Sequence, residues 1–165
     1  TGNHEFFSGL LEWMKAFEQL GIRVLKNERA RIERDGAGFD LAGVHDHSGR
    51  RMGPDFRPDL ARAVDGRDSN EPLIVLSHQS LIIDDAEKVG AGLVLSGHTH
   101  EGQIWPFNYL VRLRYPLLGG RYEVGGMTVI VCRGTGTWGP RMRLWRPSEI
   151  LRLELRAARK QDTSN

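Results

Sequence analysis

The sequence predicts a mixed α/β fold in which short buried strands alternate with helices and the second half is rich in strands. Two continuous apolar runs, residues 73–77 and 93–96, are typical of strands buried on both faces of a sheet. The pair Gly125-Gly126 separates two further strand-like runs and indicates a tight hairpin. Because neither a repeat nor a linker interrupts the chain, residues 1–156 are expected to form one unit, with residues 157–165 as a polar, disordered tail.

The first part of the chain is expected to hold a helix and a hairpin. Apolar residues at three- and four-residue spacing predict a helix over residues 8–20, which Ser8 can cap and Gly21 can end. Asn3 and His4 are expected in the loop before this helix. The next expected segments are a short strand at 23–26, a hairpin with arms at 30–34 and 39–44, and a polar loop at 45–57.

Helix signals also punctuate the middle of the chain. Pro58 suits the first turn of a helix that ends near Gly66, and Asp84 can cap a second short helix that Gly90 closes. The remaining expected segments are a long loop at 101–120, hairpin arms at 121–124 and 127–132, and a strand with one exposed face at 149–156, where leucine alternates with charged residues.

Composition excludes few classes of function. The 23 basic and 21 acidic residues among 165 leave a net charge of +2, and the two signs are interspersed, so no nucleic-acid partner is expected. The single cysteine, Cys132, cannot form an internal disulfide and is expected to be an inert core residue. The chain begins at Thr1 without a methionine, which we interpret as a piece of a longer protein whose upstream part would carry any targeting or membrane segment.

Three of the six histidines directly follow predicted buried strands. His78 follows the first strand, and His98 and His100 follow the second. Loops at the carboxyl ends of strands are where α/β sheets bind their ligands. His98 and His100 are two positions apart, so their side chains point the same way if the segment is extended. Gly97 would let the backbone turn tightly so that both rings reach one centre. A lone histidine is more often a core or surface residue, but three in equivalent positions favour a metal centre.

Three short motifs occur in one order along the chain: Gly2-Asn3-His4-Glu5, Ser77-His78 and Gly97-His98-Thr99-His100. Together they resemble the later motifs of the calcineurin-like metallophosphoesterase family. Two further stretches, residues 102–107 and 134–140, resemble a bacterial subgroup with members that are often attached to membranes. The resemblance implies the C-terminal part of a four-layer α/β/β/α sandwich, and a hydrolase that is membrane-associated through an upstream segment.

The resemblance also implies a role for each motif residue. Asn3, His78 and His98 would bind the second metal and His100 the first, while His4 would face the phosphate as general acid or transition-state stabiliser. Two cations about 3.5–4 Å apart neutralise phosphate charge and hold a hydroxide for in-line attack. Nitrogen and oxygen donors without sulfur suit manganese, iron or zinc. The implied substrate is a phosphomonoester or phosphodiester, with lipid and nucleotide-lipid esters both open.

The family's two earlier motifs, Asp-x-His and Gly-Asp, are absent from this chain. The run His45-Asp46-His47 does not match them, and we interpret it as polar loop, with a position at the rim of the site as the other interpretation. The chain by itself is therefore expected to be inactive or very weak. Its sheet edges are expected to be open to pairing, which predicts self-association of the isolated chain.

Two other functions are compatible with these residues. One is a mononuclear zinc hydrolase that uses His78, His98 and His100, and the other is a binding or scaffold module without catalysis. Glu101 stands where relatives of the family commonly carry glycine; we expect it to face solvent, and a place beside the metals is the alternative.

Two segments beyond the motifs have two interpretations each. Residues 105–118 are expected to pack over the sheet, and exposed they would suit a membrane surface or a lipid phosphate. A group of arginines and tryptophans is expected either to line a cleft for an anionic substrate or to form a solvated rim: Arg133, Arg141, Arg143, Arg146, Trp138 and Trp145.

Overall fold

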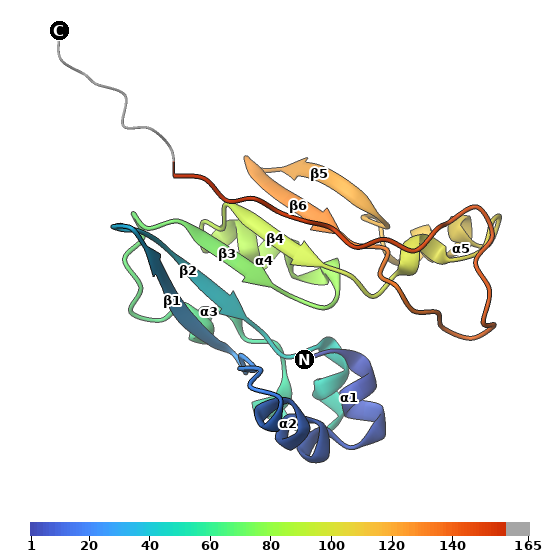
Figure 1. Ribbon diagram of the computed structural model, residues 1–165, viewed down its shortest axis with the longest axis horizontal. Helices are drawn as coiled ribbons and strands as arrows, with labels where there is room; N and C mark the ends of the chain where they lie inside the picture. The colour runs from blue at the N-terminus through green and yellow to red at the C-terminus, as the bar shows by residue number, and fades with distance from the viewer. Residues whose placement is uncertain (158–165) are drawn as a thin grey trace, which may run out of the picture.

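The structure, a computed structural model, describes residues 1–157, and within this range the strands form a six-stranded sheet of order β1-β2-β3-β4-β6-β5 (Figure 1). The four inner strands run parallel, and the outer strands β1 and β5 pair antiparallel with their neighbours. The strands are β1 Glu28–Arg34, β2 Ala37–Gly43, β3 Leu73–Leu76, β4 Leu93–Ser96, β5 Gly120–Val124 and β6 Met127–Val131. The mixed α/β prediction is therefore confirmed.

Five α-helices and four short 3-10 helices accompany these strands within the described residues, and α1 and α2 precede the first strand. The α-helices are α1 Asn3–Ser8, α2 Leu10–Gln19, α3 Leu60–Ala63, α4 Ile83–Lys88 and α5 Asn108–Arg114. The 3-10 helices are η1 His47–Arg51, η2 Pro54–Phe56, η3 Ser80–Ile82 and η4 His100–Gly102. Within residues 1–157, no helix is both long and apolar enough to cross a membrane.

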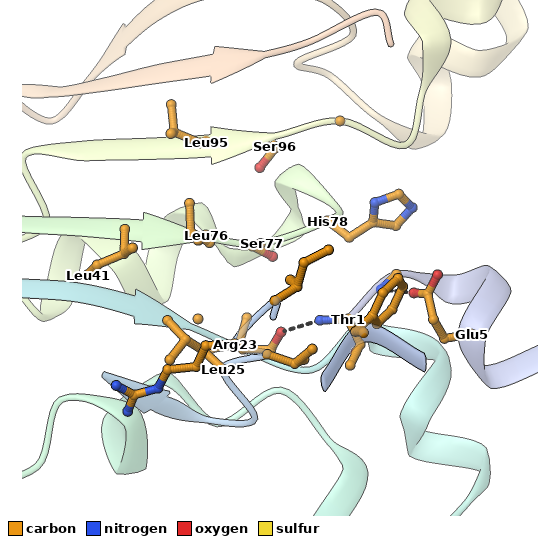
Figure 2. A pocket seen from close by; sticks show the side chains of 17 residues that line it. Thr1, Glu5, Arg23, Leu25, Leu41, Leu76, Ser77, His78, Leu95 and Ser96 are labelled. Carbon is orange, nitrogen blue, oxygen red and sulfur yellow. Dashed lines mark hydrogen bonds between the residues drawn. The ribbon is translucent and has the colours of Figure 1, made fainter. Parts of the chain in front are cut away.

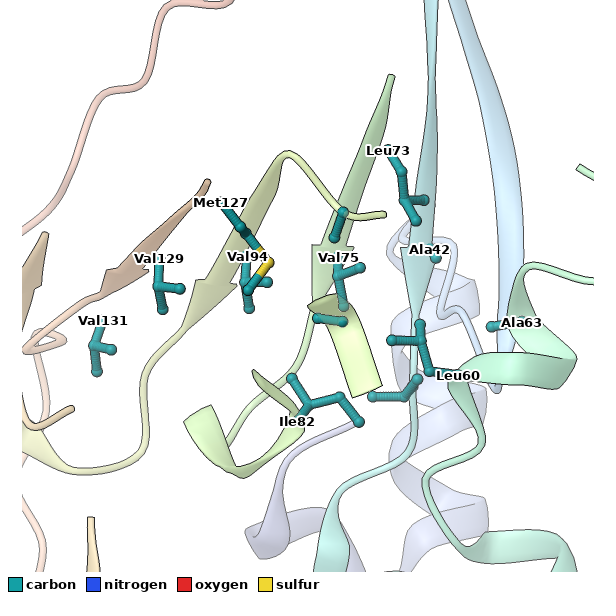
Figure 3. Close-up of a cluster of buried hydrophobic side chains, with 13 residues drawn as sticks. Ala42, Leu60, Ala63, Leu73, Val75, Ile82, Val94, Met127, Val129 and Val131 are labelled. Carbon is teal, nitrogen blue, oxygen red and sulfur yellow. The ribbon is translucent and has the colours of Figure 1, made fainter. Parts of the chain in front are cut away.

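The two faces of the sheet have different surroundings. On one face, small and branched side chains of four neighbouring strands pack against α3 and α4 (Figure 3). The side chains of this core include Ala42, Val75, Val94 and Val129 from the sheet and Leu60, Ala63, Ile82 and Ala86 from the helical side. Because side chains alternate along a strand, the next residues point to the opposite face. There Leu41, Leu76 and Leu95 are half-buried and line an open hollow of about 530 Å³ (Figure 2).

Both hairpins are confirmed and use two-residue turns. Asp35 and Gly36 have φ of 52° and 77°, and Gly125 and Gly126 have φ of 56° and 81°. Positive φ at both turn residues matches the right-handed twist of the strands. The runs predicted at 73–77 and 93–96 are confirmed as β3 and β4.

The N-terminal helix differs from the prediction at its start. Gly9 has φ of 106° and separates α1 from α2, so that Asn3 and His4 lie in a helix and not in a loop. The Ser8 hydroxyl donates to the carbonyl of His4 inside α1. It therefore does not cap α2, which begins at Leu10.

Two predicted strands are wrong. Residues 23–26 are irregular, and Leu25 instead packs over Gly43 on the open face of the sheet. Residues 149–156 are irregular as well, and Leu151 and Leu153 lie with Leu95 and Ile130 around a second hollow. Their alternating leucines cover a face of the sheet and do not extend its edge.

The other differences are local. The helix expected after Asp84 begins at Ile83, with Asp84 in its first turn and not at its cap. The helix expected from Pro58 to Gly66 is the shorter α3, capped by the Asp59 side chain. The loop expected at 101–120 contains α5. Cys132 is half-buried and lies just beyond β6. The tail predicted as disordered falls, from residue 158 on, outside the described residues.

Candidate metal centre

The five residues singled out by the motifs line one pocket of about 480 Å³. It lies where β3 and β4 end, with α1 on one side and the segment around α5 on the other. The polar lining residues are Asn3, His4, His78, His98 and His100, and the apolar wall includes Phe107, Val111, Tyr115 and Trp138. Residues nearly a hundred positions apart in sequence thus meet at one place.

Three of these side chains meet atom to atom. Asn3 Oδ1 lies 2.8 Å from His78 Nε2 and 3.2 Å from His98 Nδ1. The two imidazole nitrogens, His78 Nε2 and His98 Nδ1, are 3.2 Å apart. One amide oxygen and two ring nitrogens therefore form a triangle with sides of 2.8 to 3.2 Å.

Local structure brings Asn3 to this triangle. Gly2 precedes α1, and its N–H donates to the carboxylate of Glu5, which closes the start of the helix. A Cβ at Gly2 would lie 2.9 Å from Glu5 Oε2 and 3.4 Å from the His78 ring. The backbone at Gly2 thus runs within van der Waals reach of the His78 ring, and the next residue, Asn3, is buried beside that ring.

The loop after β4 is not extended, contrary to the prediction. His98, His100 and Glu101 have φ of 67°, 49° and 52°, so the left-handed conformation falls on the histidines themselves and not on Gly97. The Thr99 hydroxyl donates to the carbonyl of Leu118 and anchors this turn. As a result the two histidines have different polar partners.

His100 and His4 line the pocket outside the triangle. His100 Nδ1 lies 2.9 Å from Nη2 of Arg143, and a guanidinium can only donate. His4 is exposed on α1. The roles inferred for these two residues stay predictions, as do the ligand roles of the triangle.

Burial determines the protonation state of the two histidine rings in the triangle. It lowers the pKa of His78, and it lowers the pKa of His98 to about 4, with the neighbouring His78 contributing to the shift of His98. Both rings are therefore neutral near pH 7. Neutral imidazole is the form that binds metal ions.

A second set of side chains supports the triangle from behind. His98 Nε2 lies 3.0 Å from the Tyr115 hydroxyl, which lies 3.1 Å from Gln79 Oε1. Gln79 Nε2 donates to both carboxylate oxygens of Asp46, at 3.1 and 2.9 Å. Sequence reasoning missed Gln79 and Tyr115 and assigned Asp46 to a polar loop. Asp46 does lie in the loop before η1, but it is 1% exposed and so does not lie at an exposed rim.

The arginine-rich C-terminal segment is held by internal contacts. Glu101 was expected to face solvent, but its side chain is 17% exposed and pairs with Arg133 and, at 3.7 Å, with Arg146. Arg143 Nη2 donates to the carbonyls of residues 133, 134 and 136. These arginines tie the segment to the loop after β4, because a buried carboxylate and several carbonyls attract them.

The segment 105–118 is less covered than expected. Leu110 is 61% exposed and Leu113 is 85% exposed, and both lie on α5. Only part of the segment is packed, as the buried Asn108 and Leu118 show. The interpretation of a loop packed over the sheet is therefore wrong for the outer face of α5.

Carboxylates are not part of the triangle. In the stretch 1–157, no group of three or more histidine, cysteine, aspartate or glutamate side chains is placed so that it could hold a metal ion. The third corner next to His78 and His98 is an amide oxygen, that of Asn3.

Comparison with known proteins finds related chains over most of this length. A Helicobacter pylori strain J99 protein named as an uncharacterized metallophosphoesterase is 41% identical over 156 residues, which are 93% of this chain and 41% of that protein. A Danio rerio protein named "Transmembrane protein with metallophosphoesterase domain" is 35% identical over 166 residues, 96% of this chain and 38% of that protein.

A third relative is shorter. An Aquifex aeolicus protein, also named as an uncharacterized metallophosphoesterase, is 35% identical over 152 residues, 91% of this chain and 57% of that protein. The chain thus spans about two fifths of the length of the first two relatives. No family model and no solved structure matches the chain.

Proposed function

Because this chain belongs to the metallophosphoesterases by its likeness over nine-tenths of its length, we propose that the protein that contains it is a metal-dependent hydrolase of phosphate esters. The observation that carries the proposal is the triangle of Asn3 Oδ1, His78 Nε2 and His98 Nδ1. An amide oxygen and two imidazole nitrogens are ligand atoms that divalent cations bind, and here all three meet in one pocket.

The triangle fits a divalent cation. Metal–nitrogen and metal–oxygen bonds are about 2.0–2.2 Å long, so adjacent ligand atoms around one ion lie about 3 Å apart. The measured sides are 2.8, 3.2 and 3.2 Å. Two neutral histidines and an amide suit manganese, iron or zinc.

In the proposed reaction, Asn3, His78 and His98 would hold one ion, and His100 would be a ligand of a second ion. Bound cations supply charge neutralisation at the phosphoryl group and a nucleophilic hydroxide near neutral pH. His4 lines the same pocket, and we propose that its imidazole donates a proton to the oxygen of the departing alcohol. For His100 to accept a metal bond at Nδ1, Arg143 would have to release it.

A carboxylate that bridges two ions is not among the residues that the structure gathers at the triangle. The isolated chain is therefore proposed to be inactive or very weak. A zinc site of three histidines is less well supported than the amide-containing site, because Asn3, and not His100, lies beside His78 and His98 in the triangle.

The pocket wall supports a proposal on substrate class. Phe107, Val111 and Trp138 face the same pocket as the polar residues. We propose that the ester carries an apolar group, as a lipid phosphate does. Higher kcat/KM for octyl phosphate than for glycerol phosphate, two esters with similar alkoxide leaving groups, is expected, and equal values would contradict the proposal.

The exposed side of α5 supports action at a lipid surface. Leu110 and Leu113 are exposed, and Arg112 and Arg114 lie beside them. Apolar and cationic residues together suit an interface with anionic lipid. Leu113→Glu is expected to reduce co-sedimentation with vesicles of phosphatidylglycerol, and unchanged binding would contradict this proposal.

The central test uses the complete protein, stripped with a chelator and reloaded with Mn²⁺. Asn3→Ala and His98→Ala are expected to lose bound metal and hydrolysis of an aryl phosphate together, while His4→Ala keeps the metal and loses about 10²- to 10⁴-fold in kcat. Asn70→Ala, an exposed asparagine, is the matched control. Full activity in Asn3→Ala and His98→Ala would contradict the proposal, and metal counting would separate one ion from two.

A further inference from the structure

The buried side chains behind the triangle have a defined order of hydrogen bonds, and that order determines which nitrogen of His98 carries a proton. We propose that Asp46, Gln79 and Tyr115 are positioning residues that hold His98 in the tautomer whose Nδ1 presents a lone pair to the metal. This inference rests on the proposed function for its metal, but its hydrogen-bond order exists without one.

The order begins at Asp46, which is almost fully buried. A carboxylate accepts hydrogen bonds, and this one accepts from the backbone N–H of Ser48 at 2.8 Å and from the side chain of Gln79. Gln79 must therefore turn its NH₂ group toward Asp46. Its carbonyl oxygen Oε1 then necessarily faces the other way, toward Tyr115.

The order continues through Tyr115. Gln79 Oε1 has no hydrogen, so the Tyr115 hydroxyl donates its only hydrogen across the 3.1 Å contact. The phenol oxygen can then only accept from His98 Nε2, which lies 3.0 Å away. A neutral imidazole has one N–H, and here it is at Nε2.

The lone pair of His98 is thereby placed on Nδ1. This atom lies 3.2 Å from both Asn3 Oδ1 and His78 Nε2, at the proposed metal position. Second-layer hydrogen bonds of this kind fix ring orientation and tautomer in metal sites. The three residues come from separate loops: Asp46 precedes η1, Gln79 follows the ligand His78, and Tyr115 ends α5.

Reversal of the order gives a sharp test. In Asp46→Asn, the new amide can still accept from Ser48 but would donate to Gln79, so that the Gln79 amide turns over and donates to Tyr115. The Tyr115 hydroxyl would then donate to His98 Nε2, which moves the imidazole proton to Nδ1. An isosteric change at Asp46, which is separated from His98 by Gln79 and Tyr115 in the network, is thus expected to invert the tautomer of His98.

The experiment uses the complete protein. Nitrogen-15 NMR of histidine-labelled, metal-free protein reports the tautomer of His98, and calorimetric titration with Mn²⁺ reports affinity. We expect an Nε2–H tautomer in the parent protein, an Nδ1–H tautomer in Asp46→Asn and a mixture in Tyr115→Phe. Both variants are expected to bind Mn²⁺ about 10- to 100-fold more weakly. Tyr109→Phe, which is 61% exposed on the same helix, is the matched control.

The outcomes separate this inference from the proposed function. An unchanged tautomer in both Asp46→Asn and Tyr115→Phe would overturn the inference even if the protein hydrolyses phosphate esters. A changed tautomer with unchanged Mn²⁺ affinity would overturn the positioning role. A parent protein that binds no Mn²⁺ although its His98 tautomer responds as expected would contradict the proposed function and leave the hydrogen-bond order intact.

Discussion

Gly102 occupies a position where a single methyl group should disturb the site from a distance. Gly102 has φ of 74°, and a Cβ built there would lie 2.4 Å from the Cα and 2.5 Å from the Cβ of Asn108. Asn108 is the first residue of α5, the helix that leads to Tyr115. Gly102→Ala must therefore push α5 away from η4 or distort the loop after β4.

Two costs add in this variant. A left-handed backbone costs a residue with a Cβ about 1–2 kcal/mol, and overpacking against a backbone atom costs about 1–3 kcal/mol more. The expected loss of unfolding free energy is thus about 2–5 kcal/mol. Because α5 moves with Asn108, Tyr115 should also shift from His98, and the affinity for Mn²⁺ should fall.

Gly126→Ala is the matched control. Gly126 has φ of 81°, and among the described residues no heavy atom beyond Gly126 and its two chain neighbours lies within 4 Å of the position that the alanine methyl would take. Gly126→Ala should therefore lower the unfolding free energy only by the cost of the left-handed backbone, about 1–2 kcal/mol. Urea unfolding of the complete protein measures both variants. Equal losses in the two variants, or unchanged Mn²⁺ affinity in Gly102→Ala, would refute the steric reasoning.

Three further predictions follow from burial and charge. Burial lowers the pKa of His45 to about 4, below the ordinary value, so unfolding takes up a proton and stability falls by up to about 3 kcal/mol as pH decreases from about 6.5 to 4; His45→Gln should reduce this slope in urea titrations across that range, and an identical slope would contradict the assignment. Glu101→Gln leaves Arg146 without its carboxylate and leaves Arg133 only Glu149, at 3.5 Å, and should lower the unfolding free energy by about 2 kcal/mol, whereas no loss would mean that the pairs with Glu101 contribute nothing. Val94→Ala, at a fully buried core position, should cost about 2–3 kcal/mol by thermal unfolding, and a loss below about 0.5 kcal/mol would show that the core closes around the change.

Some of the fold could be predicted because its signals are local. The apolar runs of β3 and β4 and the turn at Gly125-Gly126 are each recognisable from a few adjacent residues. The strand predicted at 149–156 was wrong because its signal is not local. Alternating leucines require one apolar surface, and the sequence cannot say whether a strand edge or the face beside Leu95 supplies it.

The candidate site likewise contains some residues that the sequence could predict and others that it could not. His78 and His98 could be chosen from their chemistry and their places after strands, Asn3 could be chosen only from the family resemblance, and the structure brings the three donor atoms together. Gln79 and Tyr115 could not be chosen, since a glutamine and a tyrosine gain their meaning only from the atoms that they face. Asp46 stood in the run His45-Asp46-His47, but only the structure shows that it is buried and accepts hydrogen bonds from Gln79.

The half-buried leucines on the open face of the sheet determine how the isolated chain should respond to temperature. Contact between apolar surfaces is driven by entropy near 25 °C and weakens on cooling. Any association through Leu41, Leu76 and Leu95 should therefore grow on warming, strengthen in sulfate and reverse on ice. The outer strands β1 and β5 carry charged side chains along their length, so association through those edges would instead respond to ionic strength and pH.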